Sequence, residues 1–199
     1  MIKAILSVDN KWGIGRNNDL LFHLPLDMAF FKETTSGHVV ALGENTLLSF
    51  PNARPLKNRT HILIAKNDYQ FDNVIVTHVW EDFLKTIKEY SSKEDVYIIG
   101  GASIYNQMLP YVDEVLLTKV HADGNATVFF NNLDENPNFE IELPDEDDNH
   151  WNTVMGETEH LDQLYSELCK GKHNLIKYEL ETFYDDSRCV VIYYENKEG

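Results

Sequence analysis

Short apolar runs alternate with helical patterns through the first 120 residues of the chain. Continuous apolar runs of strand length are typical of strands that are buried on both faces of a sheet. Pro25 suits the first position of a helix, and residues 80–90 place apolar side chains at helical spacing. Strands that alternate with helices predict an α/β fold with a largely parallel sheet. The predicted strands cover residues 2–8, 38–42, 61–65, 74–76, 96–99 and 115–120.

The last third of the chain has a different pattern. Residues 177–183 and 189–194 flank a polar turn and predict an antiparallel hairpin. An acidic insert at about residues 134–174 comes before it, and the apolar side chains of residues 161–168 recur at the spacing of one amphipathic helix. Because no linker divides the 199 residues, we expect a single domain over residues 1–199.

Negative charge is concentrated in one part of the chain. The formal net charge is −16, and the fifty residues from Val120 to Cys169 contain thirteen acids and no Lys or Arg. A surface this acidic repels phosphate backbones, so we expect no nucleic-acid partner. An anionic small molecule requires a local basic pocket on such a protein.

The sequence offers few signs of a membrane, disulfide or metal. Only a strand-length apolar run follows Lys3, which predicts no signal peptide, and no run reaches the roughly 18 apolar residues of a membrane span. Cys169 and Cys189 lack CxxC spacing, and the eight histidines lack a spacing such as HExxH. We therefore expect a cytoplasmic protein without a structural disulfide or a metal site.

Glycines and polar residues follow three of the predicted strands, in Gly43-Glu44-Asn45-Thr46, Ala65-Lys66 and Gly100-Gly101-Ala102-Ser103. In parallel sheets, ligands bind beyond the carboxyl ends of the strands, where helix N-termini offer free N–H groups to phosphates. A single Gly-Gly pair equally fits a tight turn. Three such strand ends together favour a nucleotide site.

One carboxylate lies among aromatic residues. Asp27 falls in the first turn of the helix from Pro25, and Phe30 and Phe31 follow on the same helix face. The carboxylate either helps to start the helix through the helix dipole or awaits a cationic or N–H-rich partner. The polar loop at residues 9–19 fits a lid over a site and an ordinary connection equally well.

The order of these motifs resembles that of the dihydrofolate reductase family, over about residues 1–130 and the C-terminal hairpin. The resemblance implies a mixed, mostly parallel eight-stranded sheet flanked by helices. It also implies a monomer that reduces 7,8-dihydrofolate to 5,6,7,8-tetrahydrofolate with NADPH, in one-carbon metabolism, and that binds antifolate-type pterin analogues. The residues that carry the resemblance are Gly13-Ile14-Gly15, Leu24-Pro25, Asp27, Phe31, Gly43, Thr46, Arg54-Pro55-Leu56, Arg59, Ile99-Gly100-Gly101, Tyr105 and Thr118.

The resemblance assigns roles to individual residues. Asp27 would accept two N–H bonds from the pterin, and Thr118 would bond both Asp27 and the same amino group. Arg59 would bind the α-carboxylate of the glutamate tail, although an isolated arginine in a loop is as often solvated. The implied substrate-binding residues are Ile5, Ser7, Asp27, Met28, Phe31, Phe50, Leu56, Arg59, Ile99 and Thr118.

The implied catalytic residues are Asp27, Leu20 and Phe22. Asp27 would bind and polarise the ring, while a water admitted by the loop at residues 9–21 would deliver the proton. The family also implies a cis peptide between the two glycines of the implied NADPH site. That site comprises Ser7, Ile14, Gly15, Gly43, Glu44, Asn45, Thr46, Ala65, Lys66, Gly100, Gly101, Ala102, Ser103, Ile104 and Tyr105.

Three positions depart from the family pattern. Glu44 replaces the usual basic partner of the 2′-phosphate, which suits a ribose hydroxyl and makes NADH a possible cofactor, while Lys66 could restore part of a phosphate site. Leu21-Phe22 replaces the usual Pro-Trp pair, so the indole N–H that helps to order a water is missing. Ala126 replaces a frequent acid beside Thr127, which predicts weaker coupling of that loop to the lid.

Two alternative functions remain from the sequence. The related reductase of riboflavin biosynthesis shares the sheet, but Asp27 and Arg59 suit a pterin and a glutamate better than a ribityl phosphate. A non-catalytic pterin- or nucleotide-binding protein is the alternative from another class. Ligand binding without cofactor turnover would identify it.

Overall fold

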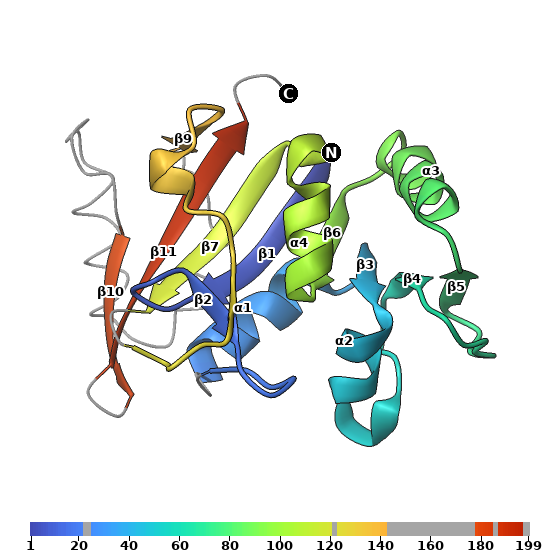
Figure 1. Ribbon diagram of the computed structural model, residues 1–199, viewed down its shortest axis with the longest axis horizontal. Helices are drawn as coiled ribbons and strands as arrows, with labels where there is room; N and C mark the ends of the chain where they lie inside the picture. The colour runs from blue at the N-terminus through green and yellow to red at the C-terminus, as the bar shows by residue number, and fades with distance from the viewer. Residues whose placement is uncertain (22–24, 121–122, 143–177, 185–186, 197–199) are drawn as a thin grey trace.

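A mixed α/β sheet forms the centre of the molecule. The computed structural model describes residues 1–21, 25–120, 123–142, 178–184 and 187–196. Within them, nine strands pair in the order β10-β11-β7-β1-β6-β3-β4-β5, and β9 also pairs with β11 (Figure 1). Their bounds are β1 Ile2–Val8, β3 Val39–Gly43, β4 Thr60–Ile64, β5 Val74–Thr77, β6 Val96–Gly100, β7 Glu114–Val120, β9 Phe139–Glu142, β10 Tyr178–Tyr184 and β11 Ser187–Asn196.

The neighbouring strands from β7 to β5 are all parallel. This agrees with the α/β, mostly parallel sheet predicted from the alternation of strands and helices. Strand β11 runs antiparallel to β7 and pairs along its other edge with β10 and then with β9. The sheet has nine described strands rather than the eight expected, because residues 139–142, predicted as acidic insert, form β9.

The C-terminal hairpin stays a prediction. Strands β10 and β11 pair antiparallel at the predicted place, with Leu180 opposite Cys189, but the turn at residues 185–186 lies outside the described residues. The amphipathic helix predicted at residues 161–168 also lies outside them.

Helices cover both faces of the sheet. Their bounds are α1 Pro25–Thr35, α2 Glu44–Ser49, α3 Trp80–Ser91 and α4 Ala102–Met108, with short 3-10 turns at Pro51–Ala53, Leu109–Tyr111 and Leu133–Glu135. Strand β1 shows the alternation that divides the core: Ala4 and Leu6 pack with α3 and α4, while Ile5 packs with α1 and α2. Figure 1 shows α4 crossing in front of the sheet. Because both faces are covered, the central strands are apolar on both sides.

The loop after β1 contains a strand that the sequence did not predict. Gly13–Gly15 forms β2 and pairs antiparallel with β8, Val128–Phe129. This small second sheet connects the loop at residues 9–20 to the segment at residues 123–130. It positions the loop beside the carboxyl ends of β1, β3 and β6.

Two further structural features concern membranes and metals. No helix in the part of the chain that the structure describes has the length and apolar character to cross a membrane. The same residues contain no cluster of three or more His, Cys, Asp or Glu side chains arranged to hold a metal ion.

Candidate active site

A cavity of about 1420 Å³ opens at the carboxyl ends of β1, β3, β4 and β6. The residues that line it come from these strand ends, from α1 and α2, and from the loop at residues 14–20. Parallel strands bring their carboxyl ends to one edge of the sheet, which explains why residues far apart in the sequence meet there. The sequence-predicted site residues in its lining are Ile5, Ser7, Ile14, Gly15, Leu20, Asp27, Met28, Phe31, Gly43, Glu44, Asn45, Thr46, Phe50, Leu56, Arg59, Ala65, Lys66, Ile99, Gly100, Gly101, Ala102, Ser103, Ile104 and Tyr105.

Two sequence-predicted residues are absent from this lining, one because it lies elsewhere and one because the structure does not describe it. Thr118 lies on β7 behind the cavity wall and reaches the site through Asp27. Phe22 lies outside the described residues.

Asp27 is one of three acidic side chains that line the cavity, with Asp19 and Glu44. It lies in the first turn of α1, and the hydroxyl of Thr118 donates a hydrogen bond of 2.5 Å to its Oδ1. Burial raises the pKa of Asp27, and the bond from Thr118 offsets part of that rise. The carboxylate therefore has a fixed orientation and has lost much of its hydration, so a ligand with paired N–H donors would replace water at its oxygens.

Apolar side chains line the same cavity as this carboxylate. Ile5 and Ile99 are buried on their strands, and Phe31, Phe50 and Leu56 pack against the same core. Leu20 and Met28 are each 54% exposed although both line the cavity. Large apolar side chains that remain exposed at a cavity are suited to cover a flat, apolar ligand.

Arg59 supplies a cation at the same cavity. Its side chain is only 9% exposed, and burial lowers the pKa of its guanidinium. Its Nη2 donates to Ser36 Oγ over 3.3 Å and its guanidinium lies 5.9 Å from the ring centre of Phe31, but its buried Nε has no partner among the described residues. Because Arg59 lines the cavity, its guanidinium can bind an external carboxylate there.

The other end of the cavity has the character of a nucleotide site. Helices α2 and α4 begin here after Gly43 and Gly101, and neither glycine provides a side-chain cap for the first-turn N–H groups. Gly100 has φ +136°, a conformation that residues with a side chain rarely adopt, and a Cβ there would lie 3.0 Å from Thr46 Oγ1. This position therefore requires glycine. The Gly100–Gly101 peptide is cis, as the family resemblance implies. The free N–H groups at the starts of α2 and α4 fit the pyrophosphate of a dinucleotide.

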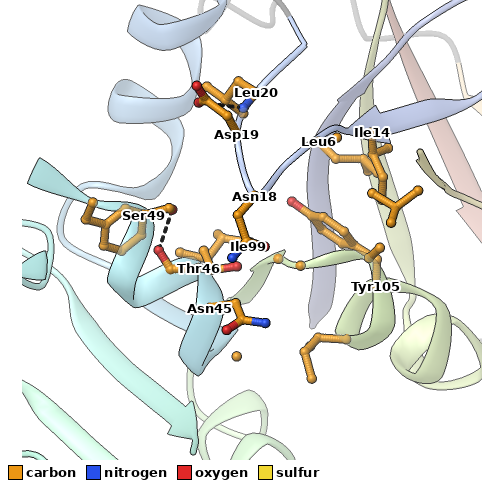
Figure 2. A pocket seen from close by; sticks show the side chains of 18 of the residues that line it. Leu6, Ile14, Asn18, Asp19, Leu20, Asn45, Thr46, Ser49, Ile99 and Tyr105 are labelled. Atoms are coloured by element: carbon orange, nitrogen blue, oxygen red, sulfur yellow. Dashed lines mark hydrogen bonds between the residues drawn. The ribbon is translucent and has the colours of Figure 1, made fainter. Parts of the chain in front are cut away.

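Figure 2 shows the side chains of Asn18, Asn45 and Thr46 around this end of the cavity. The hydroxyl of Ser49 donates to the carbonyl oxygen of Thr46 over 2.6 Å, which ties the end of α2 to its beginning. The buried hydroxyl of Tyr105 donates to the carbonyl of Ile5 over 2.8 Å and thereby joins α4 to β1. Burial and the charge of Asp27 raise the pKa of Tyr105, so it stays protonated as a donor.

The loop at residues 9–20 is held by one carboxylate. Asp9, 1% exposed, accepts the N–H of Gly13 at 2.7 Å and the N–H of Lys11 at 2.9 Å through Oδ1. Its Oδ2 accepts the N–H of Gly124 at 3.1 Å. Asp9 therefore connects the loop to the segment that carries Ala126, the position where the sequence predicts weaker coupling.

Several lining residues were not predicted from the sequence. Asn17 and Asn18 have positive φ, a conformation that asparagine tolerates better than most residues. A pair of adjacent asparagines is therefore a sequence signal for a sharp turn at this point of the loop. His78 directly follows the carboxyl end of β5 and was missed because only three strand ends were considered. The unpredicted lining residues are Leu6, Arg16, Asn17, Asn18, Asp19, Phe30, Lys32, Ser49, Pro51, Ile64, His78, Thr127 and Val128.

Comparisons with known proteins agree with this geometry. A family model described as dihydrofolate reductase matches residues 1–163. Dihydrofolate reductase of Bacillus subtilis (strain 168) is 37% identical over 136 residues, which cover 68% of this chain and 78% of the relative. That of Staphylococcus haemolyticus is 33% identical over 129 residues, which cover 65% of this chain and 75% of the relative.

A solved structure extends the similarity to the fold. It is a dihydrofolate reductase from Enterococcus faecalis complexed with NADP(H) and RAB-propyl. The TM-score is 0.72 at 24% sequence identity, and the match covers 98% of this chain and 96% of that one.

Proposed function

The chain belongs to the dihydrofolate reductase family, and on that premise we propose that its cavity reduces 7,8-dihydrofolate to 5,6,7,8-tetrahydrofolate with NADPH. One observation carries the assignment of substrate. The ordered carboxylate of Asp27 and the guanidinium of Arg59 line the same cavity. A molecule with an N–H-rich ring at one end and a carboxylate at the other satisfies both groups.

The pterin ring lies at Asp27 in this proposal. The two oxygens of the carboxylate accept the exocyclic amine and the neighbouring ring N–H, a charge-assisted pair. Thr118 holds Oδ1 in place for this contact. Ile5, Phe31 and Ile99 supply apolar surface to the ring.

The glutamate tail lies at Arg59. Arg59 lines the cavity, and its Nη2 donates to Ser36 Oγ over 3.3 Å, a long bond that a charge-assisted pair with a carboxylate would outweigh. Phe50 and Leu56 flank the path between the ring and the tail.

The cofactor occupies the glycine-rich end. The fit rests on Gly100 and on the uncapped starts of α2 and α4, where no side chain stands between the backbone and a pyrophosphate. When bound, NADPH supplies the hydride that reduces C6 of the N5=C6 bond. Gly15, Thr46 and Ser103 line the part of the cavity that would hold it.

The protein positions the reactants and controls access of water. Asp27 faces the edge of the ring that binds the carboxylate, so N5 takes its proton from water and not directly from this side chain. Leu20, half exposed on the loop at residues 9–20, covers the ring when the loop closes and limits the entry of that water. The catalytic role that the resemblance gives to Phe22 stays a prediction.

A dihydrofolate-dependent decrease of NADPH absorbance tests the proposal, with tetrahydrofolate identified as the product. Reduction of a ribosylamino-pyrimidine phosphate to its ribityl form, but no reduction of dihydrofolate, would support the riboflavin-pathway alternative. Saturable binding of dihydrofolate and NADPH without turnover would support the binding protein instead.

The finer properties belong to the same proposal. Pterin analogues of the antifolate type would compete with dihydrofolate at Asp27. We expect a monomer, and the net charge of −16 argues against nucleic acid as a partner. Membrane association and a location other than the cytoplasm have no support in the composition.

A further inference from the structure

A network of hydrogen bonds fixes Glu44 at the rim of the nucleotide end of the cavity. Glu44 is the first residue of α2 and lines the cavity. Its Oε1 accepts the backbone N–H of Lys66 at 3.1 Å. Its Oε2 accepts the amide of Asn67 at 2.9 Å and the hydroxyl of Tyr69 at 2.6 Å. The side chain therefore has one orientation, although it lies at the surface.

The same network keeps Glu44 ionised. The bonds from the Tyr69 hydroxyl and the Asn67 amide hold the pKa of Glu44 below its ordinary value. The backbone N–H groups of Lys66 and Asn67 lower this pKa as well. Oε1 accepts one of the three hydrogen bonds given above and Oε2 accepts two, so a further hydroxyl would donate to Oε1.

His78, which also lines the cavity, already has a partner at each ring nitrogen. Its Nδ1 lies 2.7 Å from the carbonyl oxygen of Ala65, and its Nε2 lies 2.7 Å from Oδ1 of Asp68. Both partners are hydrogen-bond acceptors, an arrangement that favours a proton on each ring nitrogen. The Ala65 carbonyl and the Asp68 carboxylate accordingly raise the pKa of His78. Neither N–H is left for a phosphate.

The charges at this end of the cavity balance one another. The ammonium of Lys66 makes no ion pair with the described residues and is available to a ligand, but the fixed charge of Glu44 lies beside its backbone. Asp68 neutralises His78. A dianionic 2′-phosphate would gain one cation and meet one fixed anion, whereas a 2′-hydroxyl would donate to Glu44 without an electrostatic penalty.

We propose that Glu44 is a specificity-determining residue that accepts the 2′-hydroxyl of an adenosine ribose, so that this reductase uses NADH as well as NADPH. Acidic side chains bind this hydroxyl in other NAD sites, and arginines accommodate the 2′-phosphate of NADP. The proposal rests on the proposed function. It goes further because it assigns the choice between NADH and NADPH to the carboxylate of Glu44, which Tyr69 and Asn67 hold in place.

Two measurements test this assignment. The first is kcat/KM for NADPH and NADH with dihydrofolate in the wild type. The second is calorimetric binding of adenosine 5′-monophosphate and adenosine 2′,5′-bisphosphate, which needs no turnover. We expect the two cofactors to differ by no more than roughly tenfold in kcat/KM, since one charge-assisted hydrogen bond is of that order.

Three variants identify the residue responsible. Glu44→Gln keeps the shape and removes the charge, and Glu44→Arg reverses the charge. Both variants should shift the NADPH/NADH ratio of kcat/KM, and the preference between the two adenosine nucleotides, toward the phosphorylated form. The shift should be about tenfold for Glu44→Gln and on the order of a hundredfold for Glu44→Arg. Tyr69→Phe removes a donor to Glu44 and should give a smaller shift in KM for NADH with little change in kcat. Glu89→Gln, on the exposed face of α3, is the matched control.

The outcomes separate the two proposals. A wild-type preference for NADPH and for the bisphosphate above about a thousandfold, unchanged in Glu44→Gln, would overturn the role of Glu44 and leave the reductase intact. Absence of turnover with both cofactors would overturn the proposed function. The binding preference of the two adenosine nucleotides would then still decide the role of Glu44.

Discussion

The hydroxyl of Thr118 donates to Oδ1 of Asp27 across 91 positions of the chain, and this bond joins β7 to α1 at the cavity. It fixes the orientation of a carboxylate that burial makes costly to ionise. The charged form of Asp27 is destabilised in the free protein, and its oxygens are oriented to accept two donors. A ligand that supplies two N–H donors therefore stabilises this carboxylate strongly. The predictions below test this site and the groups around it.

Asp27→Asn should lower kcat/KM for dihydrofolate by at least about a hundredfold, because the charged acceptor of the pterin N–H pair is lost.

The same change should make the free protein more stable at pH 7. A carboxyl with a raised pKa in the folded chain holds a proton that the unfolded chain has already released. The free energy of unfolding therefore falls as pH rises between the ordinary pKa and the raised pKa of Asp27.

Urea unfolding at several pH values measures this effect. The stability advantage of Asp27→Asn should be full above the raised pKa and should disappear below the ordinary pKa. Asp82→Asn, at an exposed position of α3, is the control. An Asn variant that is less stable at neutral pH would contradict the account of a desolvated carboxylate.

Thr118→Val should raise the pKa of Asp27 further, because it removes the one hydrogen bond that lowers it. Carbon-13 NMR of labelled aspartate carboxyls follows this titration directly. Loss of a bond to a charged group should also reduce kcat/KM by roughly tenfold. Thr86→Val, on α3, controls for the substitution itself. An unchanged titration of Asp27 would mean that the hydroxyl does not support the carboxylate.

Arg59→Gln should raise KM for dihydrofolate by about tenfold or more, because a charge-assisted bond to the tail carboxylate is lost. A dihydropteroate substrate, which lacks the glutamate, should show almost no change. This difference separates a role in binding the tail from a role in folding. The neighbouring exposed Arg54→Gln should leave both substrates unaffected.

Asp9→Asn should loosen the loop at residues 9–20. An amide has one acceptor oxygen, so at least one of the three N–H groups held by Asp9 loses its partner. The free energy of unfolding should fall by about 1–3 kcal/mol. Hydrogen exchange at Gly13 and Gly124 should become faster, whereas Asp72→Asn should change neither. Unchanged exchange at both glycines would show that other contacts hold the loop.

The central sheet could be predicted from the sequence for a definite physical reason. Strands such as Val39–Gly43 and Val96–Gly100 are covered on both faces, so they consist of almost continuous apolar residues. The pairing of Gly13–Gly15 with Val128–Phe129 could not be predicted, because strands of three and two residues carry too little pattern. Strand β9 was missed because the acidic residues around it masked its apolar positions.

The site was partly predictable. The strand-end glycines and Asp27 carry local signals, and the structure brings them to one cavity. The partnership of Asp27 with Thr118 followed only from the family resemblance, since no local pattern relates residues 91 positions apart. The anchoring of Glu44 by Tyr69, and the role of Asp9, depend on loop geometry that sequence spacing does not specify.

The most direct test of the central claim is transfer of deuterium from NADPH that is labelled at the nicotinamide C4. The cavity is proposed to hold the nicotinamide and the pterin in contact, so the label should appear at C6 of tetrahydrofolate in the wild type. The rate should fall at least about a hundredfold in Asp27→Asn, and Asp82→Asn should match the wild type. Oxidation of the cofactor without deuterium in the product, or with equal rates in the wild type and Asp27→Asn, would contradict the account.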